Sequence, residues 1–181
     1  IEKTQSKIAT KQVNPMTFEE EKRFKEYLIN DSHPYRNLVL IELYTGMRLG
    51  ETLALDISDI DIKSDTIRVS KILTHDENHK PYIHDSALSQ TKDGARLVQI
   101  NDVFKNNVIE AIANAEANEY NKEKLLFCQD NGSLILESSV NSYLKKVAKE
   151  VGLSYWRQFS SHRLRHTFAT RCIEAGISLP V

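Results

Sequence analysis

The sequence predicts a mainly α-helical domain that carries a small antiparallel β-sheet, an α+β class. Apolar residues recur at the intervals of three and four that an amphipathic helix requires, most regularly over residues 140–151. Residues 66–73 alternate in polarity and are rich in β-branched side chains, which is typical of a strand. Helices and strands do not alternate along the chain, so a doubly wound parallel sheet is not expected.

Three helices are expected in the first third of the chain, at residues 17–30, 35–47 and 49–55. The first begins with a capping box, because Thr17 and Glu20 are spaced so that each side chain can bond the other's backbone N–H. The second is apolar almost all round and is therefore expected inside the core. Residues 30–34 between these two helices have the composition of a turn.

The remaining elements are two further strands, at residues 80–83 and 96–100, and three helices, at residues 102–118, 140–151 and 161–175. Asp93-Gly94 is a strong turn signal before the last strand. Gly152 and Gly176 follow the last two helices, where a glycine commonly ends a helix.

Length and composition favour one ordinary globular domain. The chain has 181 residues, of which 40% are hydrophobic and 27% are charged, so it can bury a core. No apolar run approaches the roughly 18 residues that a membrane span needs, so we expect no association with a membrane. Two cysteines and no Cys/His cluster predict neither a disulfide framework nor a metal site, and they favour a reduced, cytoplasmic setting.

The net charge of −1 gives no support to nucleic-acid binding, which usually comes with a basic excess. It does not exclude such binding, because the distribution of charge over the surface decides the attraction. A function that involves DNA therefore requires a local cluster of basic residues.

Such a cluster lies at the start of the last expected helix, in residues 161–168. His162 and Arg165 are three residues apart and lie on one side of a helix, while Leu164 and Phe168 can anchor that helix in the core. Arginine offers a planar fork of donors and histidine a single donor or acceptor, which suits a phosphate oxygen. The alternative is a solvated basic helix with an incidental histidine.

Arg48 follows the buried second helix at a junction flanked by Gly46 and Gly50. An arginine there needs a partner, and Glu51 can hold it by charge-assisted hydrogen bonds. The alternative is a structural pair that pins two helices together. Lys92 lies just before the Asp93-Gly94 turn, where a surface lysine is ordinary when considered by itself.

Together these residues resemble the tyrosine recombinase (phage integrase) family. Thr-Gly-Met-Arg-Leu-Gly-Glu at residues 45–51 is similar to the family's first arginine box, and His-Arg-Leu-Arg-His-Thr-Phe-Ala-Thr at 162–170 is similar to its second. Lys92 stands between them on a hairpin turn, as the family's lysine does. The resemblance covers residues 15–181 and implies the fold of the family's catalytic domain.

The resemblance implies that a tyrosine hydroxyl cuts one DNA strand, forming a 3′-phosphotyrosine and freeing a 5′-hydroxyl, without a metal or another cofactor. Arg48 and Arg165 would hold the non-bridging oxygens of the scissile phosphate and stabilise the anionic transition state. Lys92 would protonate the leaving 5′-oxygen. His162 would donate to the phosphate or help to move the tyrosine proton. Glu51 would orient its neighbours.

The nucleophilic tyrosine of the family follows the second box, but the sequence has no tyrosine after Arg165. Tyr143 lies on the apolar face of an expected helix and Tyr155 precedes the box, so no nucleophile is assigned within this chain. Members of the family usually carry an N-terminal DNA-binding domain, so the resemblance implies that residues 1–14 are the remnant of a linker from such a domain, which is missing here. Residues 15–181 are interpreted as a catalytic domain that is incomplete at its C-terminus.

The expected function of the full-length protein is site-specific recombination of duplex DNA by a phage or mobile-element integrase that acts as a homotetramer. The fragment is expected to be monomeric and inactive in cleavage while still holding the phosphate-binding pocket. Two alternatives share these residues: a DNA-binding regulator that kept the fold without catalysis, and a type IB topoisomerase-like enzyme.

Overall fold

The computed structural model describes residues 14–85 and 95–177. Its helices are α1 (Phe18–Asn30), α2 (Arg36–Thr45), α3 (Leu49–Leu53), α4 (Asp102–Ala117), α5 (Glu137–Glu150) and α6 (Ser161–Glu174), with short 3-10 turns η1 (Ile57–Asp59) and η3 (Trp156–Gln158). Its strands are β1 (Ile60–Asp61), β2 (Thr66–Val69), β3 (Lys71–His75), β4 (Pro81–Asp85) and β5 (Arg96–Gln99). The predicted class, mainly α with small antiparallel sheets, is confirmed.

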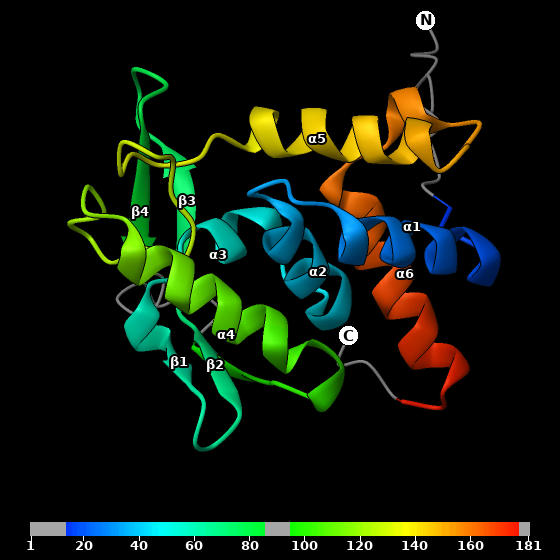
Figure 1. The fold of residues 1–181 in the computed structure, drawn as a ribbon, viewed down its shortest axis with the longest axis horizontal. Coiled ribbons are helices and arrows are strands. Elements are labelled where there is room, and N and C mark those ends of the chain that lie inside the picture. The colour runs from blue at the N-terminus through cyan, green and yellow to red at the C-terminus, as the bar shows by residue number, and fades with distance from the viewer. Residues whose placement is uncertain (1–13, 86–94, 178–181) are drawn as a thin grey trace, which may run out of the picture.

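Helix α2 forms the centre of the molecule. Figure 1 shows it between the strands at one end and α1 with α6 at the other, while α5 crosses one face. It packs against α1, α3, α4 and α6. Leu38, Val39, Leu40 and Ile41 are successive residues of α2, and each is at most 1% exposed. Burial of each such side chain stabilises the fold by about 1.5–3 kcal/mol. The prediction that this helix is buried all round is confirmed.

The start of α1 confirms the predicted capping box. The hydroxyl of Thr17 accepts from the backbone N–H of Glu20 at 3.2 Å, and the carboxylate of Glu20 accepts from the N–H of Thr17 at 2.8 Å. Two of the donors that a helix start leaves without partners are thereby satisfied. The helix buries Phe24 and Leu28 against the core.

The single strand expected at residues 66–73 is wrong: the chain forms two strands there, separated by Ser70. Strand β2 pairs antiparallel with β1 and β5, whereas β3 pairs antiparallel with β4. The β-branched pattern runs through both strands, and periodicity cannot show that the pairing partner changes. Strand β3 also packs against α3, and that contact places the hairpin β3–β4 beside the loop that follows α2.

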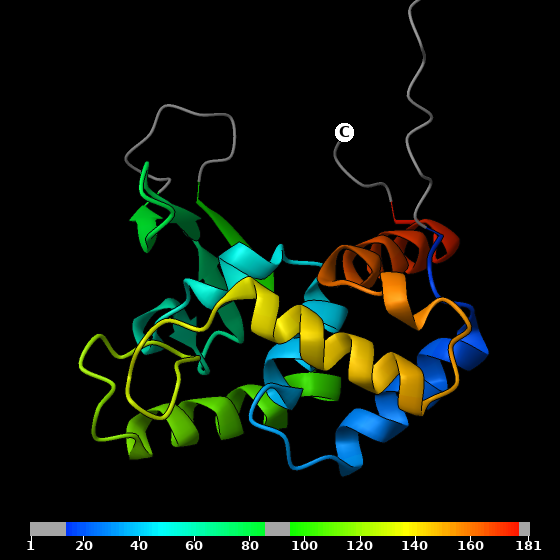
Figure 2. The ribbon, with the colours of Figure 1, turned by 90° about the horizontal axis from the view of Figure 1, so that it is seen from above.

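Helices α3 and α6 both pack against α2. Figure 2 shows α3 and the start of α6 on the same side of the molecule. Among the described residues, no helix is long and apolar enough to cross a membrane. The predicted Asp93-Gly94 turn and residues 1–13 of the predicted linker at 1–14 lie outside the described residues.

Candidate active site

A left-handed glycine directs the first arginine of the site. Helix α2 ends at Gly46, which has φ 64° and ψ 16°, a conformation that costs most other residues energy. The chain then turns so that Arg48 becomes the residue that caps the start of α3. The side chain of Arg48 remains about half exposed, at 48%. It can therefore meet a ligand from solvent.

Glu51 holds Arg48 from the protein side, as the sequence predicts. Its carboxylate accepts from the backbone N–H of Arg48 at 2.8 Å and from the Arg48 guanidinium at 3.1 Å. Arg96 of β5 also donates two hydrogen bonds to this carboxylate, at 3.0 and 2.7 Å. Burial raises the pKa of Glu51, but the bonds from Arg96 and Arg48 outweigh it and hold the pKa below its ordinary value.

Arg96 is the member of this cluster that sequence analysis missed as a site residue. It begins β5, whose pairing with β2 carries it toward α3 across a separation of 45 residues. One carboxylate faces two guanidinium groups, so the cluster of Glu51, Arg48 and Arg96 keeps a net positive charge. That charge favours an anion at the exposed side of Arg48.

Helix α6 brings the second arginine to the same place. Its buried face is anchored by Leu164 and Thr167, both fully buried. On the neighbouring face, the guanidinium of Arg165 donates to the backbone carbonyl of Gly46. The loop that positions Arg48 therefore also aims Arg165. Arg163 points elsewhere, since its guanidinium lies over the ring of Tyr155, 4.2 Å from the centroid.

A cavity of about 260 Å³ lies where these elements meet. It is lined by residues of α3, β3, α5 and α6, namely Arg48, Leu49, Gly50, Ile72, Glu137, Ser161, His162 and Arg165. Three residues that the sequence predicts as catalytic thus converge on one small cavity, whose charged lining residues are Arg48, Arg165 and Glu137. Lys92, the fourth, lies outside the described residues.

Residues 14–181 match the family model described as the phage integrase family. The chain belongs to this family. It is 26% identical to the integrase of Staphylococcus phage L54a, over 99% of this chain and 52% of that protein. It is 28% identical to a tyrosine recombinase XerC-like protein of Caldanaerobacter subterraneus subsp. tengcongensis, over 97% of this chain and 47% of that protein. The chain spans about half the length of these relatives.

Solved structures of recombinases share the fold. The Tn1549 transposon integrase in complex with transposon right end DNA matches with a TM-score of 0.78 and 23% identity, over 94% of this chain and 56% of that one. The XerA recombinase matches with a TM-score of 0.72 and 22% identity, over 91% of this chain and 52% of that one. These matches confirm the predicted fold of a tyrosine recombinase catalytic domain.

A second histidine stands beside the predicted one in this integrase-family site. The Nε2 atoms of His162 and His166 are 2.9 Å apart, and the two rings meet edge to face. Burial lowers the pKa of His166, and the charges of His162 and Arg165 lower it further. At this distance one nitrogen donates and the other accepts, so the protonation of the two rings is coupled. The spacing of four residues within the second box is the signal that could have revealed the pair.

The two tyrosines that sequence analysis rejected as nucleophiles are held by structural hydrogen bonds. Tyr143 is 4% exposed and its hydroxyl donates to Asp31 at 2.6 Å. Tyr155 donates to Glu20 at 2.8 Å. Burial and the neighbouring carboxylate raise the pKa of each phenol. Neither residue lines the cavity around Arg165.

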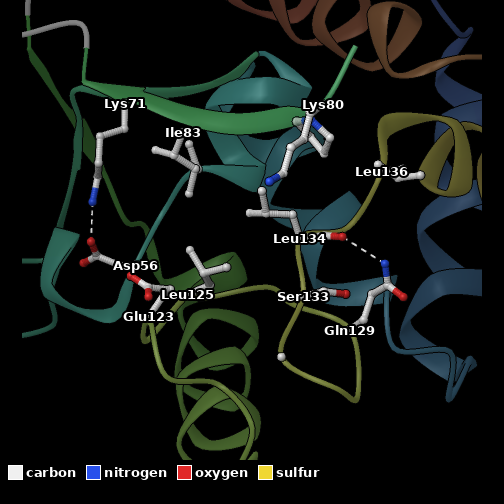
Figure 3. A pocket seen from close by; sticks show the side chains of 13 residues that line it. Asp56, Lys71, Lys80, Ile83, Glu123, Leu125, Gln129, Ser133, Leu134 and Leu136 are labelled. Atoms are coloured by element: carbon white, nitrogen blue, oxygen red, sulfur yellow. Dashed lines mark hydrogen bonds and ion pairs between the residues drawn. The ribbon is translucent and has the colours of Figure 1, made fainter. Parts of the chain in front are cut away.

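A larger cavity, of about 750 Å³, lies between β3–β4 and residues 123–136. Figure 3 shows Ile83 and Lys80 on one side of it, opposite Leu134 and Leu125. Its lining includes none of the predicted site residues. The smaller cavity at α6, which the predicted site residues line, is therefore the better candidate for the chemistry. Within the described ranges, no group of three or more His, Cys, Asp or Glu could hold a metal ion.

Proposed function

We propose that the cavity between α3 and α6 binds the scissile phosphate of duplex DNA, and that the protein is an integrase that carries out site-specific recombination. The convergence of Arg48, His162 and Arg165 on one cavity carries this proposal. The names of the relatives, an integrase and a XerC-like recombinase, support it, as do the solved integrase complexes with DNA.

The arrangement suits a phosphoryl transfer in which charge builds on the non-bridging oxygens. Arg48 and Arg165 approach the cavity from different elements, and each can donate to one of these oxygens. Glu51 and Arg96 hold Arg48 in place, so it need not reorganise during the reaction. His162 can donate to a phosphate oxygen or accept the proton of the attacking hydroxyl.

The proposed cleavage is a displacement at phosphorus. A tyrosine hydroxyl attacks phosphorus and gives up its proton to His162, the bond from phosphorus to the 5′-oxygen breaks, and Lys92 supplies a proton to that oxygen. A second 5′-hydroxyl then attacks the phosphotyrosine and reverses these changes. The sequence contains no tyrosine after Arg165, so we infer that residues 1–181 alone bind DNA without cutting it.

The proposed partner is duplex DNA, held through its phosphates, in the cytoplasm where such DNA lies. We propose that the full-length recombinase works as a homotetramer on DNA, because exchange of two duplexes requires four strand cleavages. We propose that residues 1–181 by themselves are monomeric. A stable tetramer in light scattering without DNA would contradict this last point.

DNA affinity tests the proposed phosphate site. Fluorescence anisotropy with a labelled duplex should show weaker binding for Arg165→Ala and Arg48→Ala, and each variant should reduce the slope of log affinity against log salt by about one. Lys122→Ala removes an exposed cation that does not line the cavity, and its slope should equal that of the parent chain. Equal slopes for all four proteins would contradict the assignment. A covalent DNA adduct on a denaturing gel would contradict the inferred lack of cleavage.

A further inference from the structure

A buried carboxyl group lies behind the phosphate cavity. Glu42 belongs to the last turns of α2 and is 0% exposed. The hydroxyl of Ser161 donates to its Oε1 atom. Its Oε2 atom is also buried and has no hydrogen-bond partner among the described residues. A carboxyl group with so few partners is stable in the core only when it is uncharged.

Ser161 connects this carboxyl group to the site. It is the first residue of α6 and it lines the phosphate cavity, directly before His162. Its backbone N–H donates to the side chain of Asn141 on α5 at 3.0 Å. Side chains from α2 and α5 thus fix the start of α6 from two directions. The position of α6 in turn sets where His162 and Arg165 enter the cavity.

The protonation state follows from the surroundings. Burial raises the pKa of Glu42 to about 8, against the opposing effect of the Ser161 hydrogen bond, and the negative charge of Glu137 on α5 raises it further. Glu42 is therefore mostly protonated at pH 7. Above pH 8 it carries a negative charge.

The charged groups around α2 separate into two sets. On the side of the cavity, Glu137 of α5, Arg48 at the start of α3, and His162 and Arg165 of α6 surround the space that Ser161 lines. A new charge on Glu42 therefore acts on the same groups that would hold a phosphate.

On its other sides, α2 meets charges that are already engaged. Lys25 of α1 lies over the ring of Tyr44, and Glu110 of α4 pairs with Arg36 at 2.5 Å. These groups provide matched controls, because they contact α2 without lining the cavity.

We propose that Glu42 is a positioning residue for the phosphate site: its uncharged carboxyl fixes Ser161 and the start of α6, and its ionisation weakens phosphate binding. This inference rests on the proposed function of the cavity. Ionisation acts by repulsion, because it places a negative charge behind the cavity that would hold the phosphate, while the Ser161 hydroxyl can still donate to the carboxylate. Glu42→Gln keeps the size and the hydrogen-bonding capacity of the side chain but cannot ionise.

The test compares DNA affinity by anisotropy from pH 6.5 to 9 at constant ionic strength. The parent chain should lose on the order of tenfold in affinity above pH 8, and Glu42→Gln should start somewhat weaker and then stay flat. Glu110→Gln should keep the parent profile. Ser161→Ala leaves Glu42 in place but breaks its link to α6, and it should weaken binding several-fold at pH 7 with an unchanged circular dichroism spectrum.

A second measurement does not depend on DNA. In the free protein, the amide resonances of Ser161 and His162 should shift with a midpoint near pH 8 and should not do so in Glu42→Gln. The absence of that shift overturns the role of Glu42, as does an alkaline loss of affinity that Glu42→Gln retains. If Arg165→Ala binds DNA as well as the parent chain, the phosphate site is wrong, and the amide shifts alone then decide whether Glu42 controls the start of α6. If Glu42→Gln does not fold, the affinity of Ser161→Ala decides the question.

Discussion

Gly46→Ala should destabilise the protein and also disturb the proposed phosphate site. A Cβ atom added at Gly46 would lie 2.2 Å from Cδ1 of Phe168, well inside van der Waals contact. Relief of such overpacking costs about 1–3 kcal/mol. The positive φ of 64° adds about 1–2 kcal/mol for a residue that carries a Cβ. The expected loss in the free energy of unfolding is therefore about 2–5 kcal/mol.

Gly176→Ala isolates the backbone contribution. Gly176 also has a positive φ, 76°, but a Cβ added there meets nothing within 4 Å. Its substitution should cost about 1–2 kcal/mol at most, since only the conformational strain applies. Urea unfolding followed by circular dichroism gives both free energies, and the difference between the two variants measures the clash with Phe168.

The second substitution Phe168→Leu tests the same contact from the other side. A smaller side chain at 168 should tolerate the new methyl group, so Gly46→Ala should cost less in the Phe168→Leu background than in the parent chain. The DNA affinity of Gly46→Ala should fall as well, because the Gly46 carbonyl aims Arg165. The reasoning is refuted if Gly46→Ala costs no more than Gly176→Ala, or if Phe168→Leu leaves the cost of Gly46→Ala unchanged.

Two further predictions concern hydrogen-bonded side chains. Glu51→Gln should destabilise the fold by about 1–3 kcal/mol at neutral pH, because it removes the counter-charge of Arg48 and Arg96. The fold lowers the pKa of Glu51 below its ordinary value of 4.5, so its stabilising charge is fully present above pH 4.5. The difference in unfolding free energy between Glu51→Gln and the parent chain should therefore shrink as the pH falls below 4.5. A difference that grows in acid would contradict this reasoning. Tyr143→Phe should lower the free energy of unfolding by about 1 kcal/mol, because it removes the hydrogen bond to Asp31, and should leave DNA affinity unchanged. A loss of DNA affinity of the same size would instead give Tyr143 a role at the site.

The helices could be predicted from the sequence because their signals are local. The capping residue Thr17, the all-round apolar pattern of α2 and the regular spacing of α5 each depend on residues within a few turns. The division of residues 66–75 between two sheets could not be predicted. It depends on pairing with Arg96–Gln99 on one side and Pro81–Asp85 on the other, and nothing near Ser70 in the sequence encodes that choice.

The site residues likewise fall into those that sequence motifs reveal and those that only the structure reveals. Arg48, His162 and Arg165 stand in short motifs whose residue types carry their chemistry, and the structure brings them to one cavity. Arg96 and Glu42 stand in no motif. Arg96 reaches Glu51 only because β5 pairs with β2, and Glu42 looks like an interruption of an apolar helix until Ser161 packs against it. Contacts between distant segments create both roles.

The last turns of α2 govern the geometry of the whole site. Glu42 bonds Ser161, the carbonyl of Gly46 accepts from Arg165, and the bare Cα of Gly46 leaves room for Phe168. These three contacts hold three successive turns of α6 against one end of α2. Arg48 follows Gly46 by two residues, so the short chain between them also limits where the first arginine can lie. The separation of the two guanidinium groups is therefore set by the end of a buried helix and the short loop that follows it, which suits the proposed binding of one phosphate.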